Sequence, residues 1–371
     1  MSTDPPLNFD SSRRDFLTGR SVQNEVERAG HQIADEIFKE NERSRPHGGN
    51  TIRLSTQAMA CDFSVVMNQG ASAHLMTAAD ALEIVHQLED QMTVYREESE
   101  LSRLNRSAFE NPVKVEPRLF GLLLESKRIS EETGGAFDPT SGPLISLWRS
   151  CRQEGRIPTE GEIAECLQHT GLENVRFNER EMTVQFLDAD AEFNLGGIGK
   201  GYALDRAGAY LMEAGVSDWL IHGGFSSILA KGHHQGQGGW PVGIRNPLLP
   251  HETLGTILLK DQALATSGSG VQSFRVAGKK HGHILDPRTG RPVEGLLSVT
   301  VLAPTAALAD ALSTAFFVLG LEKAREYCDN HPEVSSLLIP PPPRGRRLTP
   351  INCGIPDEVL FLETSTTPPP E

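Results

Sequence analysis

Apolar positions along this chain follow two different periods, and the two periods alternate from residue 51 onward. Apolar and polar residues alternate, as in half-buried strands, in residues 51–67 (two strands around a turn), 182–186, 218–224, 239–247, 255–266 and 298–304. Apolar residues recur every three or four positions, as in amphipathic helices, in residues 71–92, 118–134, 202–215 and 306–320. Strands and helices interleaved in this way predict a mixed α/β or α+β fold.

The first 50 residues have a different pattern. Helical spacing within a charged stretch predicts an amphipathic helical arm, with its apolar residues at Val22, Val26, Ala29, Ile33 and Ile37. The arm and a linker, SRPHGGN at 44–50, make up a first segment, residues 1–50. We expect one domain over residues 51–362, followed by a disordered tail at 363–371.

The first segment contains SSRRDFLTGR, which resembles a twin-arginine export signal. Such a signal continues with an apolar stretch of about 7–15 residues, whereas residues 21–44 are charged throughout. No cysteine lies near the start to carry a lipid anchor, and no stretch approaches the roughly 20 apolar residues of a transmembrane helix. We therefore expect a cytoplasmic protein without a transmembrane segment.

Composition narrows the class of partner. The chain has 49 acidic and 35 basic residues and a formal net charge of −14, which argues against broad binding to nucleic acid or anionic membranes. Its five cysteines are scattered and form no C-x-x-C pair, so neither a disulfide framework nor a zinc site is indicated. The oligomeric state stays open, and a homo-oligomer is compatible with the sequence.

The stretch AEFNLGGIGKGYALDRAG, residues 191–208, places Lys200 among four glycines at the start of a predicted helix. Glycines let a backbone approach a ligand, and a helix start offers N–H groups to an anion, so the stretch suggests a phosphate site. Asn194 and Gly201 stand where a Walker A loop needs glycine and Ser or Thr, and Tyr202 breaks the pattern G-x-G-x-x-G. A plain strand-to-helix connection is the alternative.

A carboxylate and a hydroxyl stand four residues apart in ADALSTA, residues 309–315. Asp310 and Thr314 therefore share one face of a predicted helix. This pair suits Mg²⁺, which prefers oxygen ligands and completes its shell with water and substrate phosphates. The alternative is an acid near a helix start beside a threonine that faces the core.

Polar residues gather in a predicted turn in HGHILDPRTGRPV, residues 281–293, which Pro287 and Gly290 impose. His283 could accept a proton with Asp286 as its orienter, and Arg288 could meet a phosphate. A polar turn without a catalytic role is equally compatible with these residues.

Two aromatic residues are candidates for contact with a planar ring. Phe137 stands beside Asp138 in GGAFDPTSGPLISLW, residues 134–148, where two glycines and two prolines predict an irregular loop. Tyr95 precedes the charged stretch SELSRLNR. A core position for Phe137 and a solvated helix start after Tyr95 are the alternatives.

In their order along the chain, these segments resemble the motifs of the ApbE family, the FAD:protein FMN transferases. The resemblance covers about residues 51–320 and rests on MAC (59–61), TVY (93–95), SELSRLNR (99–106), GAFDPTSGPL (135–144), NLGGIGKGYALD (194–205), HGG (222–224), TSG (266–268), HILDPRTG (283–290) and ADALSTA (309–315). The chain departs from the usual pattern at Ala60–Cys61 for Gly-Thr, Asn194 for Asp, Phe225 for a polar residue, and Ser269–Gly270 for an acidic or tyrosine-bearing pair.

The resemblance implies an ApbE-like, T-fold-like α+β domain. It also implies a Mg²⁺-dependent reaction that transfers FMN from FAD to a threonine of an acceptor protein and releases AMP. It implies a metal held by the main-chain carbonyl of Gly197 and the side chains of Asp310 and Thr314. The positions where family members contact FAD are Met59, Tyr95, Ala136, Phe137, Asp138, Asn194, Lys200 and Ile284.

For catalysis we expect Lys200 to act at the phosphates. We expect His283 to assist deprotonation of the incoming threonine, with Asp286 as its alternative or orienter. The same metal-binding and phosphate-binding groups would serve threonine or water as the nucleophile, so two other functions stay open. One is hydrolysis of FAD to FMN and AMP, and the other is flavin binding without catalysis.

Overall fold

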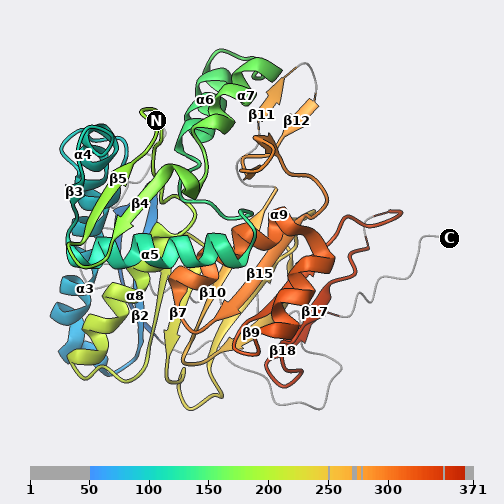
Figure 1. Ribbon diagram of the computed structural model, residues 1–371. Helices are drawn as coiled ribbons and strands as arrows, with labels where there is room; N and C mark the ends of the chain where they lie inside the picture. Colours follow the sequence, from blue (N-terminus) through green and yellow to red (C-terminus); the bar gives the residue numbers. More distant parts are fainter. Residues whose placement is uncertain (1–50, 250, 270–273, 277–278, 346, 364–371) are drawn as a thin grey trace, which may run out of the picture.

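The computed structural model describes residues 51–363, apart from 250, 270–273, 277–278 and 346. The expected helical arm at 1–50 and residues 364–371 of the expected tail lie outside the described residues. Strands and helices interleave through the described part of the chain, which confirms a mixed α+β fold (Figure 1). Its helices are η1 (Ala71–His74), α3 (Leu75–Met92), α4 (Glu100–Ser107), α5 (Pro117–Glu132), α6 (Gly142–Gln153), α7 (Glu160–Gln168), η2 (Leu172–Asn174), α8 (Gly199–Glu213) and α9 (Ala306–Asn330).

An antiparallel eight-stranded main sheet organises the described chain. In order across the sheet, its strands are β1 (Thr51–Ala58), β2 (Cys61–Asn68), β6 (Trp219–Gly223), β7 (Ser227–Lys231), β10 (Gln262–Gly268), β15 (Ser298–Ala303), β16 (Ser335–Ile339) and β17 (Ile351–Cys353). The neighbours β2 and β6 pair with Met67 opposite Trp219. A long insertion that carries α3 to α8 therefore begins and ends at adjacent strands.

Smaller sheets surround the main sheet. Three-stranded sheets are formed by β18 (Leu360–Leu362), β9 (Thr253–Leu259) and β8 (Trp240–Arg245), and by β3 (Val113–Lys114), β5 (Thr183–Phe186) and β4 (Val175–Asn178). Two hairpins pair β11 (Phe274–Val276) with β12 (Lys279–His281) and β13 (Leu285–Asp286) with β14 (Arg291–Pro292).

The two faces of the main sheet pack against different layers. Helices α8 and α9 lie against one face, and β7, β10 and β15 run behind them in Figure 1. Phe63 and Val65 of β2 are fully buried toward this helix face. Alternation along the strand turns Ser64 and Val66 to the other side, called here the outer face. Val66 packs there against a second apolar cluster that includes buried side chains of β8 and β9.

Helices α8 and α9 approach each other closely at their N-terminal turns. A Cβ atom added to Gly201 would lie 2.0 Å from the carbonyl oxygen of Ala306, so only glycine fits there. The carboxylate of Asp205 accepts hydrogen bonds from the backbone N–H groups of Ala306 (2.7 Å) and Ala307 (2.8 Å). A side chain of α8 thus satisfies N–H groups that the first turn of α9 cannot satisfy itself.

The helices predicted within the described residues are confirmed. Helix α9 has non-helical angles at Gly320 (φ 76°, ψ −175°), where the sequence predicts its end, and a second helical segment continues from there to Asn330. Two details differ from expectation. The single strand predicted at 255–266 is two strands, β9 and β10, joined by a turn in which Asp261 has φ 52°. The predicted loop at 134–148 contains the start of α6, because Ser141–Gly142–Pro143 begins a helix with proline in its first turn. Within the described residues, no helix is both long enough and apolar enough to span a membrane.

Candidate active site

Lys200 in the first turn of α8 and Asp310 in α9 meet where the two helices converge. The Lys200 Nζ lies 3.4 Å from Asp310 Oδ2, and the backbone N–H of Gly201 donates to the same oxygen at 3.1 Å. The other carboxylate oxygen, Oδ1, accepts a hydrogen bond from Ser227 Oγ of β7 at 3.1 Å. Asp310 is only 5% exposed, so three partners fix a buried carboxylate in one orientation.

Thr314 and the glycine loop lie next to this carboxylate. Thr314 is one helical turn beyond Asp310, and its Oγ1 donates to the Asp310 carbonyl at 3.4 Å. A Cβ added to Gly197 would lie 3.7 Å from Thr314 Oγ1 and 3.3 Å from a ring carbon of Phe137. The structure therefore brings Gly197, Phe137, Asp310, Thr314 and Lys200 together from three separate segments.

The donor set at this place suits a hard divalent cation. Carboxylate, hydroxyl and backbone carbonyl oxygens are the protein ligands that Mg²⁺ and Ca²⁺ take, and Asp310, Thr314 and Gly197 supply these types. The ammonium of Lys200 occupies the same neighbourhood and partly balances the buried carboxylate. The residues present therefore fit a Mg²⁺ ion bound together with an anionic ligand.

Asn194 shapes the glycine loop from within. Its Oδ1 accepts a hydrogen bond from the Gly196 N–H at 2.9 Å, and its own N–H donates to the Pro139 carbonyl at 2.7 Å. The first contact is an Asx-turn of the kind that short polar side chains form in loops. The second ties the glycine loop to the segment of Phe137 and Asp138.

The segment after α5 is held by its own side chains. Gly134 and Gly135 have positive φ angles of 58° and 74° and end the helix. Asp138 Oδ1 accepts hydrogen bonds from Thr140 N–H (2.8 Å) and Thr140 Oγ1 (2.6 Å), while Ala136 and Phe137 are buried. Burial raises the pKa of Asp138, and its bonds to Thr140 lower it by less. The described bonds of Asp138 thus go to its own loop.

The turn at 283–290 pairs Asp286 with Arg288. The Asp286 carboxylate accepts from the Arg288 backbone N–H and from its guanidinium Nε (2.8 Å) and Nη2 (2.9 Å). This bidentate contact raises the pKa of Arg288. His283 is exposed and the adjacent Ile284 is buried. Since the Asp286 carboxylate is taken up by Arg288, its role as orienter of His283 stays a prediction.

The hairpin turn between β1 and β2 borders the Lys200–Asp310 pair. Met59 and Ala60 form the turn with φ angles of 48° and 58°. Burial raises the pKa of the Cys61 thiol, the charge of Lys200 lowers it, and the charge of Asp310 raises it. Cys61 is close enough to both groups to respond to their charges.

Tyr95 is an expected site residue whose described contacts lie apart from this group. Its ring is 67% exposed and carries the Arg149 guanidinium 4.7 Å from its centroid. Its expected contact with FAD stays a prediction.

Sequence reasoning missed Ser227, Cys61 and Asp205 as neighbours of the site. Ser227 is 83 residues from Asp310 along the chain, and Asp205 caps α9 across about a hundred residues. Ser227 follows HGG closely and Asp205 ends the segment NLGGIGKGYALD. Their positions in or next to these motifs were the sequence signal that could have identified them as neighbours of the site.

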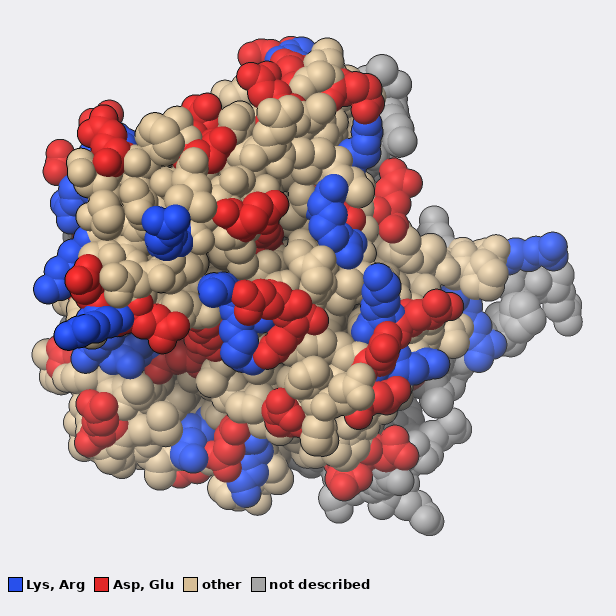
Figure 2. Space-filling view, viewed as in Figure 1, with Lys and Arg blue, Asp and Glu red and all other residues tan. Residues whose placement is uncertain are grey.

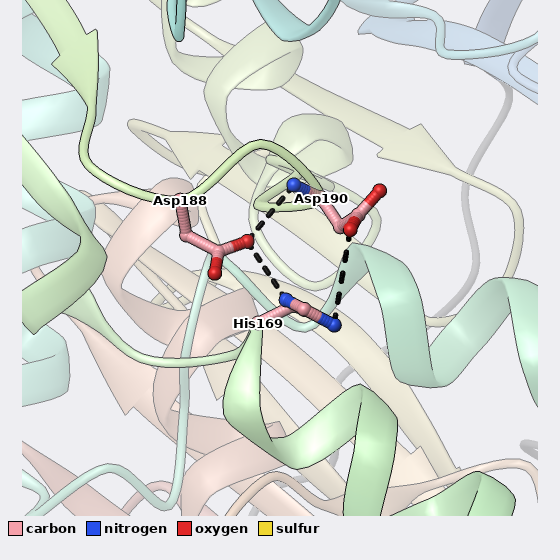
Figure 3. Close-up of side chains that lie close together, drawn as sticks. All are labelled: His169, Asp188 and Asp190. Carbon is pink, nitrogen blue, oxygen red and sulfur yellow. Dashed lines mark hydrogen bonds and ion pairs between the residues drawn. The ribbon is translucent and has the colours of Figure 1, made fainter.

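A second cluster of metal-ligating residue types lies elsewhere (Figure 3). His169 stands at the end of α7. Its Nδ1 lies 2.7 Å from Asp188 Oδ1, and its Nε2 lies 3.9 Å from Asp190 Oδ2. Asp188 Oδ1 also accepts the Asp190 N–H at 2.8 Å. These contacts join the end of α7 to the loop after β5, and the cluster shares no residue with the Lys200–Asp310 group.

A cavity of about 380 Å³ lies between α6–α7 and the β13–β14 hairpin. Its lining includes Trp148, Ile163, His281, Arg291 and Pro292. None of the expected site residues lines it, so the cavity does not mark the Lys200–Asp310 group.

Fold and site define an α+β protein with a glycine-rich loop beside a buried carboxylate, a lysine and a hydroxyl. The chain belongs to the ApbE family, whose model matches residues 58–338. A relative from Salmonella typhimurium, an FAD:protein FMN transferase, is 35% identical over 243 residues, which cover 63% of this chain and 69% of the relative. The Vibrio cholerae FAD:protein FMN transferase is 32% identical over 281 residues, covering 73% and 82%.

Solved structures agree with this assignment. The ApbE protein of Thermotoga maritima superimposes with a TM-score of 0.73 at 30% identity, covering 81% of this chain and 96% of that protein. The flavin transferase ApbE of Vibrio cholerae gives a TM-score of 0.70 at 26% identity, covering 82% and 97%.

Proposed function

We propose that this protein is a Mg²⁺-dependent FAD:protein FMN transferase that attaches FMN to a threonine of an acceptor protein and releases AMP. The observation that carries the proposal is the buried Asp310 carboxylate, held by Lys200, Gly201 and Ser227 beside Thr314 and the glycine loop. This arrangement occurs in a chain of the ApbE family whose relatives are named for this activity.

Each group has a separate part in the proposed reaction. Phosphoryl transfer depends mainly on positioning and on neutralising charge at the phosphate oxygens. The Lys200 ammonium offers three N–H donors to the pyrophosphate of FAD, and the N–H groups at the start of α8 add a positive dipole end. Bound Mg²⁺, held by Asp310, Thr314 and the Gly197 carbonyl, would supply further charge stabilisation at the same oxygens.

Proton removal from the incoming threonine is the part that we propose for His283. An imidazole is the side chain that most often serves as a general base. His283 is exposed, as a base that meets a hydroxyl of a second protein must be. The bidentate grip of Asp286 on Arg288 leaves that guanidinium fixed in the same turn, where it would face an anionic ligand.

The test uses Asp310→Asn, with Asp329→Asn as its matched control, because Asp329 is an exposed acid on the same helix. Each protein is incubated with FAD, Mg²⁺ and a candidate acceptor domain, and mass spectrometry follows attached FMN and free FMN. We expect Asp310→Asn to lose about 100-fold or more in rate, since charge stabilisation at such sites is worth several kcal/mol. Asp329→Asn should match the wild type.

A second readout does not depend on turnover. Mg²⁺ with FAD should raise the melting temperature of the wild type and of Asp329→Asn, and Mg²⁺ should add nothing to the effect of FAD in Asp310→Asn. Wild-type turnover in Asp310→Asn would overturn the metal assignment. Free FMN without attached FMN would point to FAD hydrolysis, and no FAD turnover by the wild type would point to flavin binding alone.

A further inference from the structure

Three neighbouring strands carry a polar cluster on the outer face of the main sheet. Arg53 of β1 donates from Nη2 to Ser64 Oγ of β2 at 2.9 Å and lies 3.3 Å from His222 Nε2 of β6. A guanidinium has no acceptor, so His222 accepts through Nε2. Burial, and to a smaller extent the charge of Arg53, lower the pKa of His222 to about 4. His222 is therefore neutral near pH 7.

Phe225 extends this cluster at the turn after β6. The His222 ring stacks on it with a centroid distance of 5.8 Å and an interplanar angle of 17°. The Arg245 guanidinium at the end of β8 lies 4.6 Å from the centroid of the same ring. Phe225 is 68% exposed, so the ring orders an arginine at the surface rather than filling a core.

Neither arginine is paired with a carboxylate within the described residues. The described hydrogen bonds of Arg53 go to the hydroxyls of Ser55 and Ser64 and to His222, and the described contact of Arg245 is the ring. The acid that acts on this cluster is Asp62, which raises the pKa of His222 by less than burial lowers it. Both guanidinium groups are held in place without a carboxylate in the described residues, and a guanidinium placed in this way can bind an anionic group from outside.

This cluster borders the reaction centre. The N–H of Gly224 donates to the Asp62 carbonyl at 2.7 Å, and a Cβ on Gly224 would meet the Cys61 sulfur at 3.2 Å. Cys61 in turn responds to the charges of Lys200 and Asp310. Phe225 is also two residues from Ser227, which donates to Asp310 Oδ1 at 3.1 Å, so this turn leads directly to a residue that contacts the Lys200–Asp310 pair.

The two positive sites nevertheless face opposite sides of the sheet. Ser227 on the helix face bonds Asp310, whereas His222 and its partner Ser64 lie on the outer face. A pyrophosphate held at Lys200 cannot also reach Arg53 through the sheet. A second polypeptide that presents its threonine at the strand ends can contact both faces.

We propose that Arg53 and Arg245, held by His222 and Phe225, bind an acidic segment of the acceptor protein close in sequence to the modified threonine. This inference rests on the proposed function, because it places an acceptor threonine at the Lys200–Asp310 group. The arginines select an acidic segment and bring its threonine to the strand ends, while FAD is held by other residues.

The probes are synthetic peptides with one threonine and one aspartate placed two to six residues before or after it. Matched peptides carry asparagine in place of the aspartate. The wild type is compared with Arg245→Gln, with Arg53→Gln plus Arg245→Gln, and with Arg325→Gln, which changes an exposed arginine of α9 as a control. Peptide binding is measured by fluorescence anisotropy at low and high salt, and FMN transfer by mass spectrometry.

We expect the wild type and Arg325→Gln to bind the best aspartate peptide about tenfold more tightly than its asparagine match, with the difference shrinking in high salt. The double variant should lose this preference for the aspartate peptide and keep the wild-type affinity for FAD. Arg245→Gln should lose part of the preference. Arg245→Glu should instead favour a lysine peptide.

Other results would overturn the inference. One such result is that the wild type binds the aspartate and asparagine peptides with equal affinity. Another is that the double variant loses affinity for both peptides to the same extent. Loss of FAD affinity in the double variant would assign the arginines to FAD. Because anisotropy needs no transfer, a protein that binds aspartate peptides selectively but only hydrolyses FAD would contradict the proposed function and leave the acidic-segment site supported.

Discussion

Ala60 occupies a backbone conformation that costs free energy for any residue with a side chain. It has φ 58° in the two-residue turn where Ala58 pairs with Cys61. The left-handed region disfavours an L-residue by roughly 1–2 kcal/mol. Family members usually have glycine at this position, and glycine adopts that conformation freely. The strain therefore lies in a turn that borders the Lys200–Asp310 pair.

Replacing Ala60 with glycine should release this strain. We expect Ala60→Gly to raise the free energy of unfolding by about 1 kcal/mol, because relief of the strained angle outweighs the added freedom of the unfolded chain. Urea denaturation measures the change. Ala58→Gly is the control, since Ala58 is a strand residue whose replacement should lower stability by about 0.5–1 kcal/mol. A destabilised Ala60→Gly would show that the turn is not strained.

At the residue scale, the sequence indicated groups but not their partners. Asp310 and Thr314 could be placed on one helical face because four residues make about one turn. The contact of Lys200 with Asp310 joins positions 110 residues apart, and no local pattern encodes it. The hydrogen bonds of Asp286 to Arg288 formed within the turn itself, where the sequence had suggested His283 as the partner.

Asp205 is a titratable residue that joins α8 to the first turn of α9 by hydrogen bonds. Burial raises the pKa of this carboxyl to about 7, and its bonds to the N–H groups of Ala306 and Ala307 lower it by less. The charges of Glu125 and Asp310 contribute smaller upward effects to the same value. A carboxyl with a raised pKa favours the folded state when protonated, and that contribution fades as pH rises from about 4 to about 7.

Asp205→Asn should weaken this pH dependence. The wild type should lose stability on the order of a few kcal/mol between pH 5 and pH 8 through Asp205, and the variant should lose less because asparagine does not titrate. Urea denaturation at the two pH values gives the difference. Asp329→Asn, an exposed acid of α9, should keep the wild-type slope. The same slope in Asp205→Asn would exclude Asp205 as its source.

At the element scale, long periodic segments were predictable and short irregular ones were not. The periods of α8 and α9 gave their positions directly. The sequence predicts one strand over 255–266, because Asp261 is the single turn-forming residue between its two apolar halves. The start of α6 was hidden by glycine and proline, which also serve in the first turn of helices.

The surface of the whole molecule mixes charges of both signs. On the face in Figure 2, acidic and basic side chains are interspersed and no continuous basic tract appears. The expectation that nucleic acid is not the partner rests on the net charge of −14 and stays a prediction. An acidic segment would then be attracted by a few arginines at defined positions rather than by the net charge of the whole molecule.

Removal of residues 1–45 should leave the reaction intact. Every strand of the main sheet and every residue of the candidate site lies within residues 51–363, so we expect FAD turnover within about twofold of the full chain. Turnover and melting temperature of both proteins provide the measurement. The cytoplasmic location stays a proposal, and an N-terminus cleaved after export would contradict it.

The order of strands in the main sheet was beyond sequence reasoning. Alternation identified β2 and β6 as strands, but their pairing spans the entire insertion between Asn68 and Trp219. Which strands become neighbours depends on how the apolar faces of α3, α8 and α9 pack together, and local patterns do not contain that information.

This long insertion determines when a newly made chain becomes active. Ribosomes build the chain from its N-terminus, so Phe137, Asn194 and Lys200 emerge well before Asp310 and Thr314. Strand β2 also cannot pair along its second edge until β6 has been synthesised. A chain that stops before α9 carries the glycine loop without the carboxylate, and on the proposed function it cannot cleave FAD. Incomplete chains of this kind would therefore not consume FAD.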